Sequence, residues 1–222
     1  MVISESNKFI FLHNPKCAGT SIRLALKEFD TRANYYWLFD EIDGHKIDKA
    51  HMPLNIFRRF SPEDFSLINA YFVFGFVRNP YARVLSAFNE GHQVLYRDFK
   101  ADKVSFSDYQ TKVNSYVAKL TKKNVSGWEF KHRHFVSQTS MFWLEGKLYA
   151  DAVIKVEELN DRLEQLNIFL PEVGEKLYRN LKNRNEKPIS YTADQILNQD
   201  AIEVINKLYY DDFVIFDYPI IK

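Results

Sequence analysis

The chain has 222 residues, of which 46% are hydrophobic and 27% are charged, a composition typical of globular proteins. Its formal net charge of +1 provides no basic field for nucleic acid, so we expect no nucleic-acid partner. A single cysteine excludes an intramolecular disulfide, and no apolar stretch approaches the length of a membrane span. The length predicts one domain over residues 1–222.

The first predicted elements are a strand and a helix that are joined by a polar turn. Residues 9–12 (FIFL) are all apolar, which is typical of a parallel strand covered on both faces. A helix with an apolar stripe is predicted to begin near Thr20. Residues 34–39 (NYYWLF) are a candidate second strand, and residues 46–54 (KIDKAHMPL) indicate a strand or an extended loop.

The same succession recurs further along the chain. Residues 71–77 (YFVFGFV) predict the strongest strand, and Asn79 is expected to cap a helix whose first residue is Pro80. Residues 105–120 have a helical pattern. Residues 151–156 (DAVIKV) predict another strand, followed by a helix from Glu157.

The C-terminal part of the chain predicts one last helix. It begins at Thr192, where Gln195 completes a capping box. Because strand, polar turn and helix recur, the sequence predicts an α/β fold, a three-layer sandwich with a mainly parallel central sheet flanked by helices. Ligands bind such sheets at the carboxyl ends of the strands, where two polar turns lie.

The first polar turn, residues 14–21 (NPKCAGTS), has the chemistry of an anion site. Gly19 permits close approach of the backbone, and the following helix directs its N–H groups and positive dipole end at the turn. Lys16 adds a positive charge, but because it precedes the glycine the turn is not a Walker loop. Two interpretations stay open: a cradle for a nucleotide phosphate, or a C-x5-R phosphatase loop running from Cys17 to Arg23.

The second polar turn offers a second anion site at the end of the other buried strand. Arg78 has a planar fork that suits phosphate, and Ser86 lies two turns into the next helix. Two anion sites at two strand ends suit a ligand with two separated anionic groups.

Both turns resemble motifs of one enzyme family. Residues 13–21 (HNPKCAGTS) resemble the 5′-phosphosulfate loop of sulfotransferases that use 3′-phosphoadenosine 5′-phosphosulfate (PAPS), and residues 72–88 resemble their 3′-phosphate motif. The chain is most similar to carbohydrate sulfotransferases that modify heparan, dermatan or chondroitin chains and to their small bacterial relatives. The resemblance extends to residues 49–54, 134–143 and 151–159.

The resemblance implies a P-loop-like sandwich, PAPS as co-substrate, no metal, and in-line sulfuryl transfer to a carbohydrate hydroxyl. Lys16 would neutralise the oxygen that leaves the sulfur. Arg184 or Lys187, in residues 183–188, would lie near the 3′-phosphate. The full set of expected donor-binding residues is Lys16, Cys17, Ala18, Gly19, Thr20, Ser21, Arg78, Ser86, Arg184 and Lys187.

The acceptor hydroxyl requires a base, and the resemblance favours His51 for this role. Turnover would then rise with pH through the histidine range. We expect His13 to be structural, and His132 and His134 to belong to a basic patch suited to an anionic sugar. Glu157 is expected to begin a helix.

Two rival functions remain. A phosphatase using Cys17 and Arg23 would leave Lys16 and the second turn unexplained. A non-catalytic nucleotide- or glycan-binding module would keep both turns and have no use for His51. The N-terminus has no apolar signal core, so we expect a cytoplasmic protein, or a Golgi-lumen protein only if an anchor had been trimmed.

Overall fold

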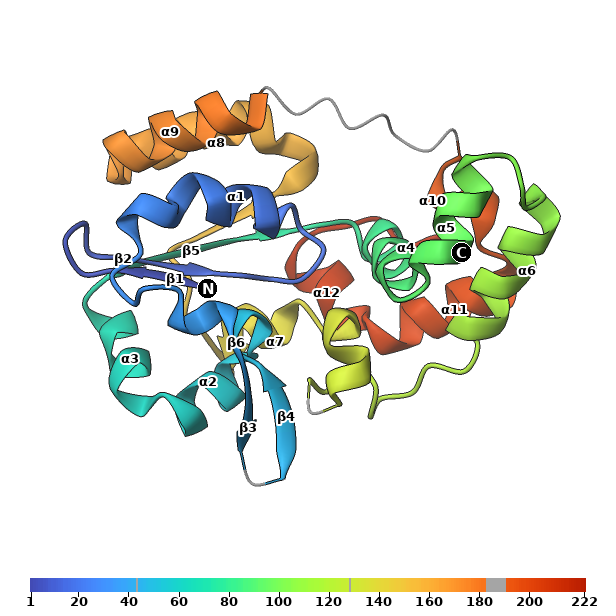
Figure 1. Ribbon diagram of the computed structural model, residues 1–222, viewed down its shortest axis with the longest axis horizontal. Coiled ribbons are helices and arrows are strands. Elements are labelled where there is room, and N and C mark those ends of the chain that lie inside the picture. Colours follow the sequence, from blue (N-terminus) through green and yellow to red (C-terminus); the bar gives the residue numbers. More distant parts are fainter. Residues whose placement is uncertain (43, 128, 183–190) are drawn as a thin grey trace.

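The computed structural model describes residues 1–42, 44–127, 129–182 and 191–222, and its centre is a four-stranded sheet (Figure 1). The strand order is β1 (Val2–Ser4), β2 (Phe9–Leu12), β5 (Phe72–Val77) and β8 (Ala152–Lys155). β2, β5 and β8 are parallel, and β1 is an antiparallel edge strand. The predicted α/β fold with a mainly parallel sheet is confirmed.

Both faces of the sheet are buried, which explains why its strands are apolar throughout. Phe9 and Phe11 of β2 pack on one side, whereas Ile10 and Leu12 pack on the other. Helices α1 (Gly19–Leu26), α8 (Leu159–Phe169) and α9 (Pro171–Lys182) cover the first face (Figure 1). Helices α2 (Leu54–Phe60), α3 (Pro62–Ser66), α7 (Thr139–Phe142) and α12 (Tyr210–Ile215) lie on the second.

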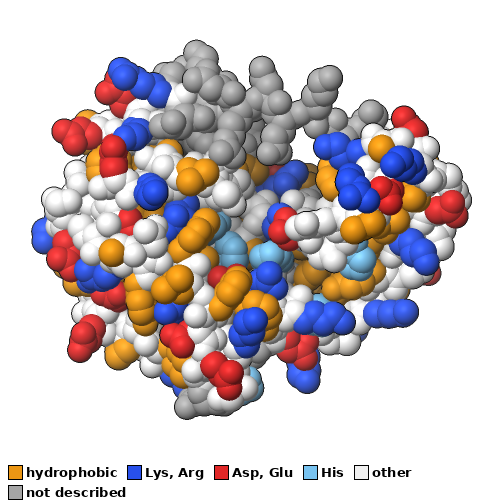
Figure 2. Space-filling view, viewed as in Figure 1, with side chains coloured by type: hydrophobic (Ala, Val, Ile, Leu, Met, Phe, Trp, Pro, Cys, Tyr) orange, Lys and Arg blue, Asp and Glu red, His pale blue; other side chains and the backbone are white. Residues whose placement is uncertain are grey.

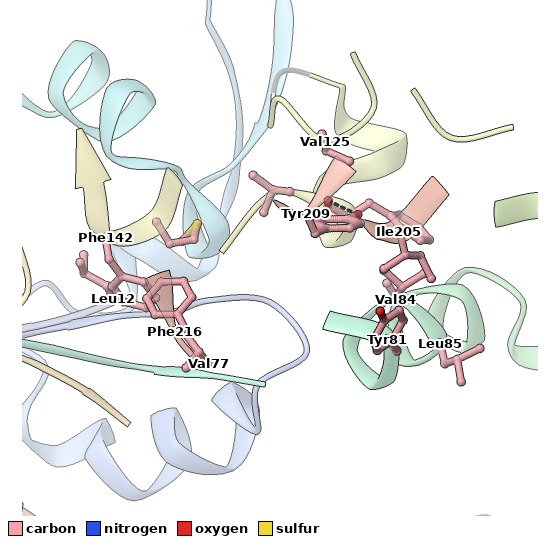
Figure 3. Packing of buried hydrophobic residues seen from close by; sticks show 14 of the residues in the cluster. Leu12, Val77, Tyr81, Val84, Leu85, Val125, Phe142, Ile205, Tyr209 and Phe216 are labelled. Atoms are coloured by element: carbon pink, nitrogen blue, oxygen red, sulfur yellow. Dashed lines mark hydrogen bonds between the residues drawn. The ribbon is translucent and has the colours of Figure 1, made fainter. Parts of the chain in front are cut away.

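A lobe of helices continues the core beyond the sheet. It contains α4 (Pro80–Gly91), α5 (Gln93–Lys100), α6 (Phe106–Val117), α10 (Ala193–Ile196) and α11 (Gln199–Leu208). In Figure 3, Val77 and Phe216 lie on the sheet side, and Val84 and Ile205 lie between α4 and α11. One apolar cluster thus joins the lobe to the sheet and fixes how α4 leaves β5.

Two hairpins complete the fold. β3 (Phe39–Ile42) pairs with β4 (His45–Asp48), and β6 (Trp143–Leu144) pairs with β7 (Lys147–Leu148). The short 3₁₀ helices are Lys27–Phe29, Tyr35–Trp37, Lys49–His51, Leu67–Asn69, Phe130–Phe135 and Val156–Glu158.

The predicted strand at residues 34–39 is wrong. Asn34 has a left-handed backbone, and the 3₁₀ helix Tyr35–Trp37 follows it. Tyr36 is buried against Phe57 and donates its hydroxyl hydrogen to Asp64, and Trp37 packs against His13 and Arg23, so contacts with distant residues anchor this segment. A strand begins only at Phe39.

The prediction of a single C-terminal helix is also wrong, although the predicted start at Thr192 is correct. The capping box of Thr192 and Gln195 is present, but α10 ends at Ile196. Asn198 then caps a second helix, because its side chain accepts a hydrogen bond from the Ala201 N–H. The predicted cap at Asn79 is confirmed, since its side chain accepts from the N–H groups of Tyr81 and Ala82.

Candidate functional site

An open cleft of about 1110 Å³ lies at the carboxyl ends of the three parallel strands. Its lining includes the residues that directly follow each strand: His13 after β2, Arg78 after β5 and Val156 after β8. This is where a parallel sheet is expected to bind a ligand. Figure 2 shows histidine side chains near the middle of one face, with lysine and arginine side chains beside them. The predicted site residues in the lining are Lys16, Ala18, Gly19, Thr20, Ser21, His51, Arg78 and Ser86.

The backbone of the first turn is shaped for an anion. Lys16 and Ala18 have positive φ angles of 65° and 58°, a conformation that L residues adopt rarely and that turns successive N–H groups toward one side. Ala18 is the N-cap of α1 and gives the helix no side-chain cap. The Ser21 N–H donates to the Ala18 carbonyl at 3.0 Å, whereas the N–H groups of Gly19 and Thr20 precede the first hydrogen bond of the helix, so this end of α1 is open to an anion.

Gly19 is required here by its neighbour. A Cβ atom at this position would lie 1.9 Å from Nε2 of His13. The His13 ring stacks on Phe11 and Trp37 and is only 3% exposed. Burial holds its pKa well below the usual histidine value, so His13 is a neutral packing residue that shapes the turn.

Cys17 faces the interior and not the cleft. Its thiol is buried, with Sγ 3.4 Å from Oε1 of Gln138, and burial raises its pKa to about 12. Arg23 lies elsewhere, with its guanidinium 3.6 Å above the Trp37 ring and a 2.7 Å hydrogen bond to Asn34. A C-x5-R phosphatase needs an exposed thiolate beside its arginine, so this geometry argues against that function. Cys17 can contribute only its backbone to a ligand in the cleft.

The second turn is held against the first. Nη1 of Arg78 lies 3.5 Å from the carbonyl oxygen of Lys16, and the Arg78 side chain is partly exposed to the cleft. Glu157 accepts a 2.7 Å hydrogen bond from the Asn79 N–H and one from the Tyr218 hydroxyl. Glu157 lies in a 3₁₀ turn ahead of α8, so it braces the second turn rather than beginning the helix.

One face of α4 lines the cleft with Ala82, Ser86 and Glu90, which are spaced four residues apart. Glu90 brings a negative charge to the site. Its carboxylate lies 3.2 Å from the Lys16 ammonium. Lys16, which is 21% exposed, is thus paired across the cleft with a residue one turn beyond Ser86.

His51 has one ring nitrogen that carries no hydrogen. Its Nδ1 lies 3.0 Å from the carbonyl oxygen of His13, and because a carbonyl only accepts, Nδ1 carries the hydrogen. Nε2 is then the basic nitrogen. Burial and the nearby charges of the N-terminus, Arg133 and Lys16 lower the pKa of His51 to about 3. The lowered pKa places the titration of His51 below the histidine range in which turnover is expected to rise, so in the unliganded protein His51 is neutral at pH 7.

The basic patch predicted at His132 and His134 is not formed by these two histidines. His134 lines the cleft, but burial lowers its pKa to about 3, so it is neutral. His132 lies outside the cleft lining and bonds Glu129 at 2.8 Å. The positive charge at this side of the cleft comes from Arg133, whose Nε donates to Asp48 at 3.1 Å.

Asp48, His51 and His134 place possible ligand atoms within 4.8 Å of one another. The Asp48 carboxylate is already engaged, because it accepts from both Arg133 and the Ala50 N–H. We interpret this cluster as a hydrogen-bonded wall of the cleft and assign no metal to it.

The sequence does not predict Glu90 and Gln138 as site residues. Arg184 and Lys187 lie outside the described residues. Glu90 has a signal, since it follows Ser86 by one helical turn. Gln138 lies in residues 134–143, to which the resemblance extends, but nothing in the sequence indicates its contacts with the two turns, which lie 60 and 124 residues away.

A comparison with protein-family models matches the Sulfotransferase family over residues 1–219. The chain therefore belongs to the sulfotransferase family. No match was found among curated proteins or solved structures. Among the described residues, the longest apolar helices fall short of what crossing a membrane requires.

Proposed function

We propose that this chain transfers the sulfuryl group of PAPS to a hydroxyl of a carbohydrate acceptor. One observation carries the proposal: two anion-binding turns at neighbouring strand ends line the same cleft as a neutral histidine. A donor with a 5′-phosphosulfate and a 3′-phosphate matches the two turns. Family membership supports sulfuryl transfer in general.

The residues of the first turn fit the 5′ end of the donor. The open N-terminus of α1 and the left-handed backbone at Lys16 and Ala18 provide N–H groups, and Thr20 and Ser21 add hydroxyl groups. The Lys16 ammonium leaves Glu90 and neutralises the negative charge that develops on the bridging oxygen. Arg78 and Ser86 hold the 3′-phosphate.

PAPS brings a sulfuryl group whose leaving group is a stabilised anion, so the protein supplies position and charge. His51 takes the proton of the acceptor hydroxyl at Nε2. Trp37 and Phe39 line the same cleft. The Trp37 ring is covered by the Arg23 guanidinium and the His13 ring, whereas Phe39 is 55% exposed and offers ring surface to the apolar side of a sugar. The exposed Phe39 supports a carbohydrate as the acceptor.

A transfer assay tests this function. Radiolabelled PAPS is incubated with a panel of polysaccharides that differ in charge and linkage, with a chelator present and no metal added. We expect label in at least one polysaccharide, and none with Lys16→Ala. Tight binding of 3′-phosphoadenosine 5′-phosphate without transfer to any polysaccharide would favour a binding module. Phosphate release from aryl phosphates that disappears in Cys17→Ser would indicate a phosphatase instead.

A further inference from the structure

A buried glutamine joins the two turns. Gln138 immediately precedes α7 and is fully buried. Its Oε1 accepts hydrogen bonds from Nδ2 of Asn14 at 3.1 Å and from the backbone N–H of Arg78 at 2.9 Å. Its Nε2 donates to the Arg78 carbonyl oxygen at 2.9 Å. Asn14 belongs to the first turn and Arg78 to the second, so one side chain contacts both.

The position of Gln138 is itself fixed from the other side. Its backbone N–H donates to Asp212 at 3.0 Å. Asp212 is fully buried and also accepts from Ser137 and Thr139 at 2.7–2.8 Å. A buried carboxylate that receives this many hydrogen bonds orders the groups around it. The turn that carries Gln138 is therefore rigid, and the side chain has little freedom to shift.

We propose that Gln138 is a positioning residue that sets the spacing between the two donor-phosphate turns. This inference rests on the proposed function. A ligand with two phosphates gains affinity over either phosphate alone only if both binding groups stand at the right separation, because the second contact then costs little additional entropy. Gln138 pairs the N–H and the carbonyl of Arg78, so it fixes the residue that begins the second turn relative to Asn14.

The test compares three ligands: 3′-phosphoadenosine 5′-phosphate, adenosine 5′-phosphate and adenosine 3′-phosphate. Gln138→Met keeps the length of the side chain and removes both hydrogen-bonding atoms. We expect its affinity for the bisphosphate to fall roughly 10–100-fold and its affinity for each monophosphate to fall less than about threefold. The advantage of the bisphosphate over the monophosphates shrinks accordingly.

Two further variants separate positioning from folding. Thr139→Val removes a hydroxyl that bonds Asp212 and contacts neither turn, so it should lower stability and keep the bisphosphate advantage. Gln138→Glu keeps the acceptor oxygen and loses the donor to the Arg78 carbonyl, so its bisphosphate advantage should be intermediate. Gln138→Glu also serves if Gln138→Met does not fold.

The outcomes are distinct. If the parent protein binds the bisphosphate no better than the monophosphates, the proposed function fails. If the parent binds the bisphosphate more tightly than the monophosphates, and the Gln138 variants lose affinity for all three ligands by the same factor, Gln138 is merely structural and the inference is overturned. A bisphosphate advantage that both Gln138 variants retain would also overturn it.

Discussion

The His51→Ala substitution removes the imidazole that we propose accepts the acceptor proton. General base catalysis by a placed side chain is worth about 10²–10⁴ in rate, so turnover should fall by that factor. At 1.36 kcal/mol per tenfold change this corresponds to about 2.7–5.4 kcal/mol of barrier. Donor affinity should change little, because the hydrogen bond of His51 goes to the His13 carbonyl and to neither Lys16 nor Arg78.

A matched variant isolates the base from the packing. His51→Asn retains an N–H group that can donate to the His13 carbonyl, but its side chain is not basic at neutral pH. Turnover should therefore fall in both variants, whereas thermal stability should fall more in His51→Ala. Steady-state transfer rates, calorimetry with 3′-phosphoadenosine 5′-phosphate and thermal unfolding are measured on each protein.

The pH dependence follows from the low pKa of His51. A pKa lowered from 6.5 to about 3 keeps the imidazole neutral, so kcat/KM should be flat between about pH 6 and 8. The positive charge of Lys16 contributes to this lowering. A bound anionic donor opposes that charge, so the apparent pKa in kcat should lie above the one in kcat/KM.

Three results would refute this reasoning. Near-parental turnover in His51→Ala would assign the proton to another group. Weaker nucleotide binding together with lower stability in both variants would make His51 structural. A rise in kcat/KM with a midpoint near the ordinary histidine pKa would show that His51 titrates as an exposed side chain does.

Three other substitutions test the donor side. Arg78→Ala should weaken binding of 3′-phosphoadenosine 5′-phosphate by about 1.5–3 kcal/mol and weaken adenosine 5′-phosphosulfate less; equal losses in calorimetry would separate Arg78 from the 3′-phosphate. Glu90→Gln removes a carboxylate that pairs with Lys16 and repels an anionic donor, so donor affinity should rise about two- to fivefold; a decrease would give Glu90 a binding role. Cys17→Ser should keep most transferase activity, because its thiol is buried away from the cleft; complete loss in a folded protein that still binds nucleotide would contradict this.

The parts of the fold that the sequence predicts are those with local causes. The strand at residues 71–77, the Asn79 cap and the open turn before α1 depend on neighbouring residues, and the structure has all three. The prediction of a strand at residues 34–39 is wrong because its apolar side chains are typical of a strand, whereas contacts with distant residues fix its path, among them Tyr36 with Asp64 and Trp37 with His13.

The site residues that the sequence predicts also have local causes, and the others depend on the folded chain. Lys16 and Arg78 were found because each lies next to a predicted strand end. The role of Gln138 could not be found, since its two partners come from distant parts of the chain. The charge states of His51 and His134 could not be predicted either. Burial lowers their pKa values, and only the folded chain shows that they are buried.

The most direct test of the account is a crystal structure with 3′-phosphoadenosine 5′-phosphate bound. We expect the 5′-phosphate at the N-terminus of α1, within hydrogen-bond distance of Gly19, Thr20 and Ser21, and the 3′-phosphate beside Arg78 and Ser86. Lys16 should have left Glu90 and turned toward the 5′-phosphate. A nucleotide bound with its phosphates outside these two turns, or with the 3′-phosphate at the N-terminus of α1, would contradict the account.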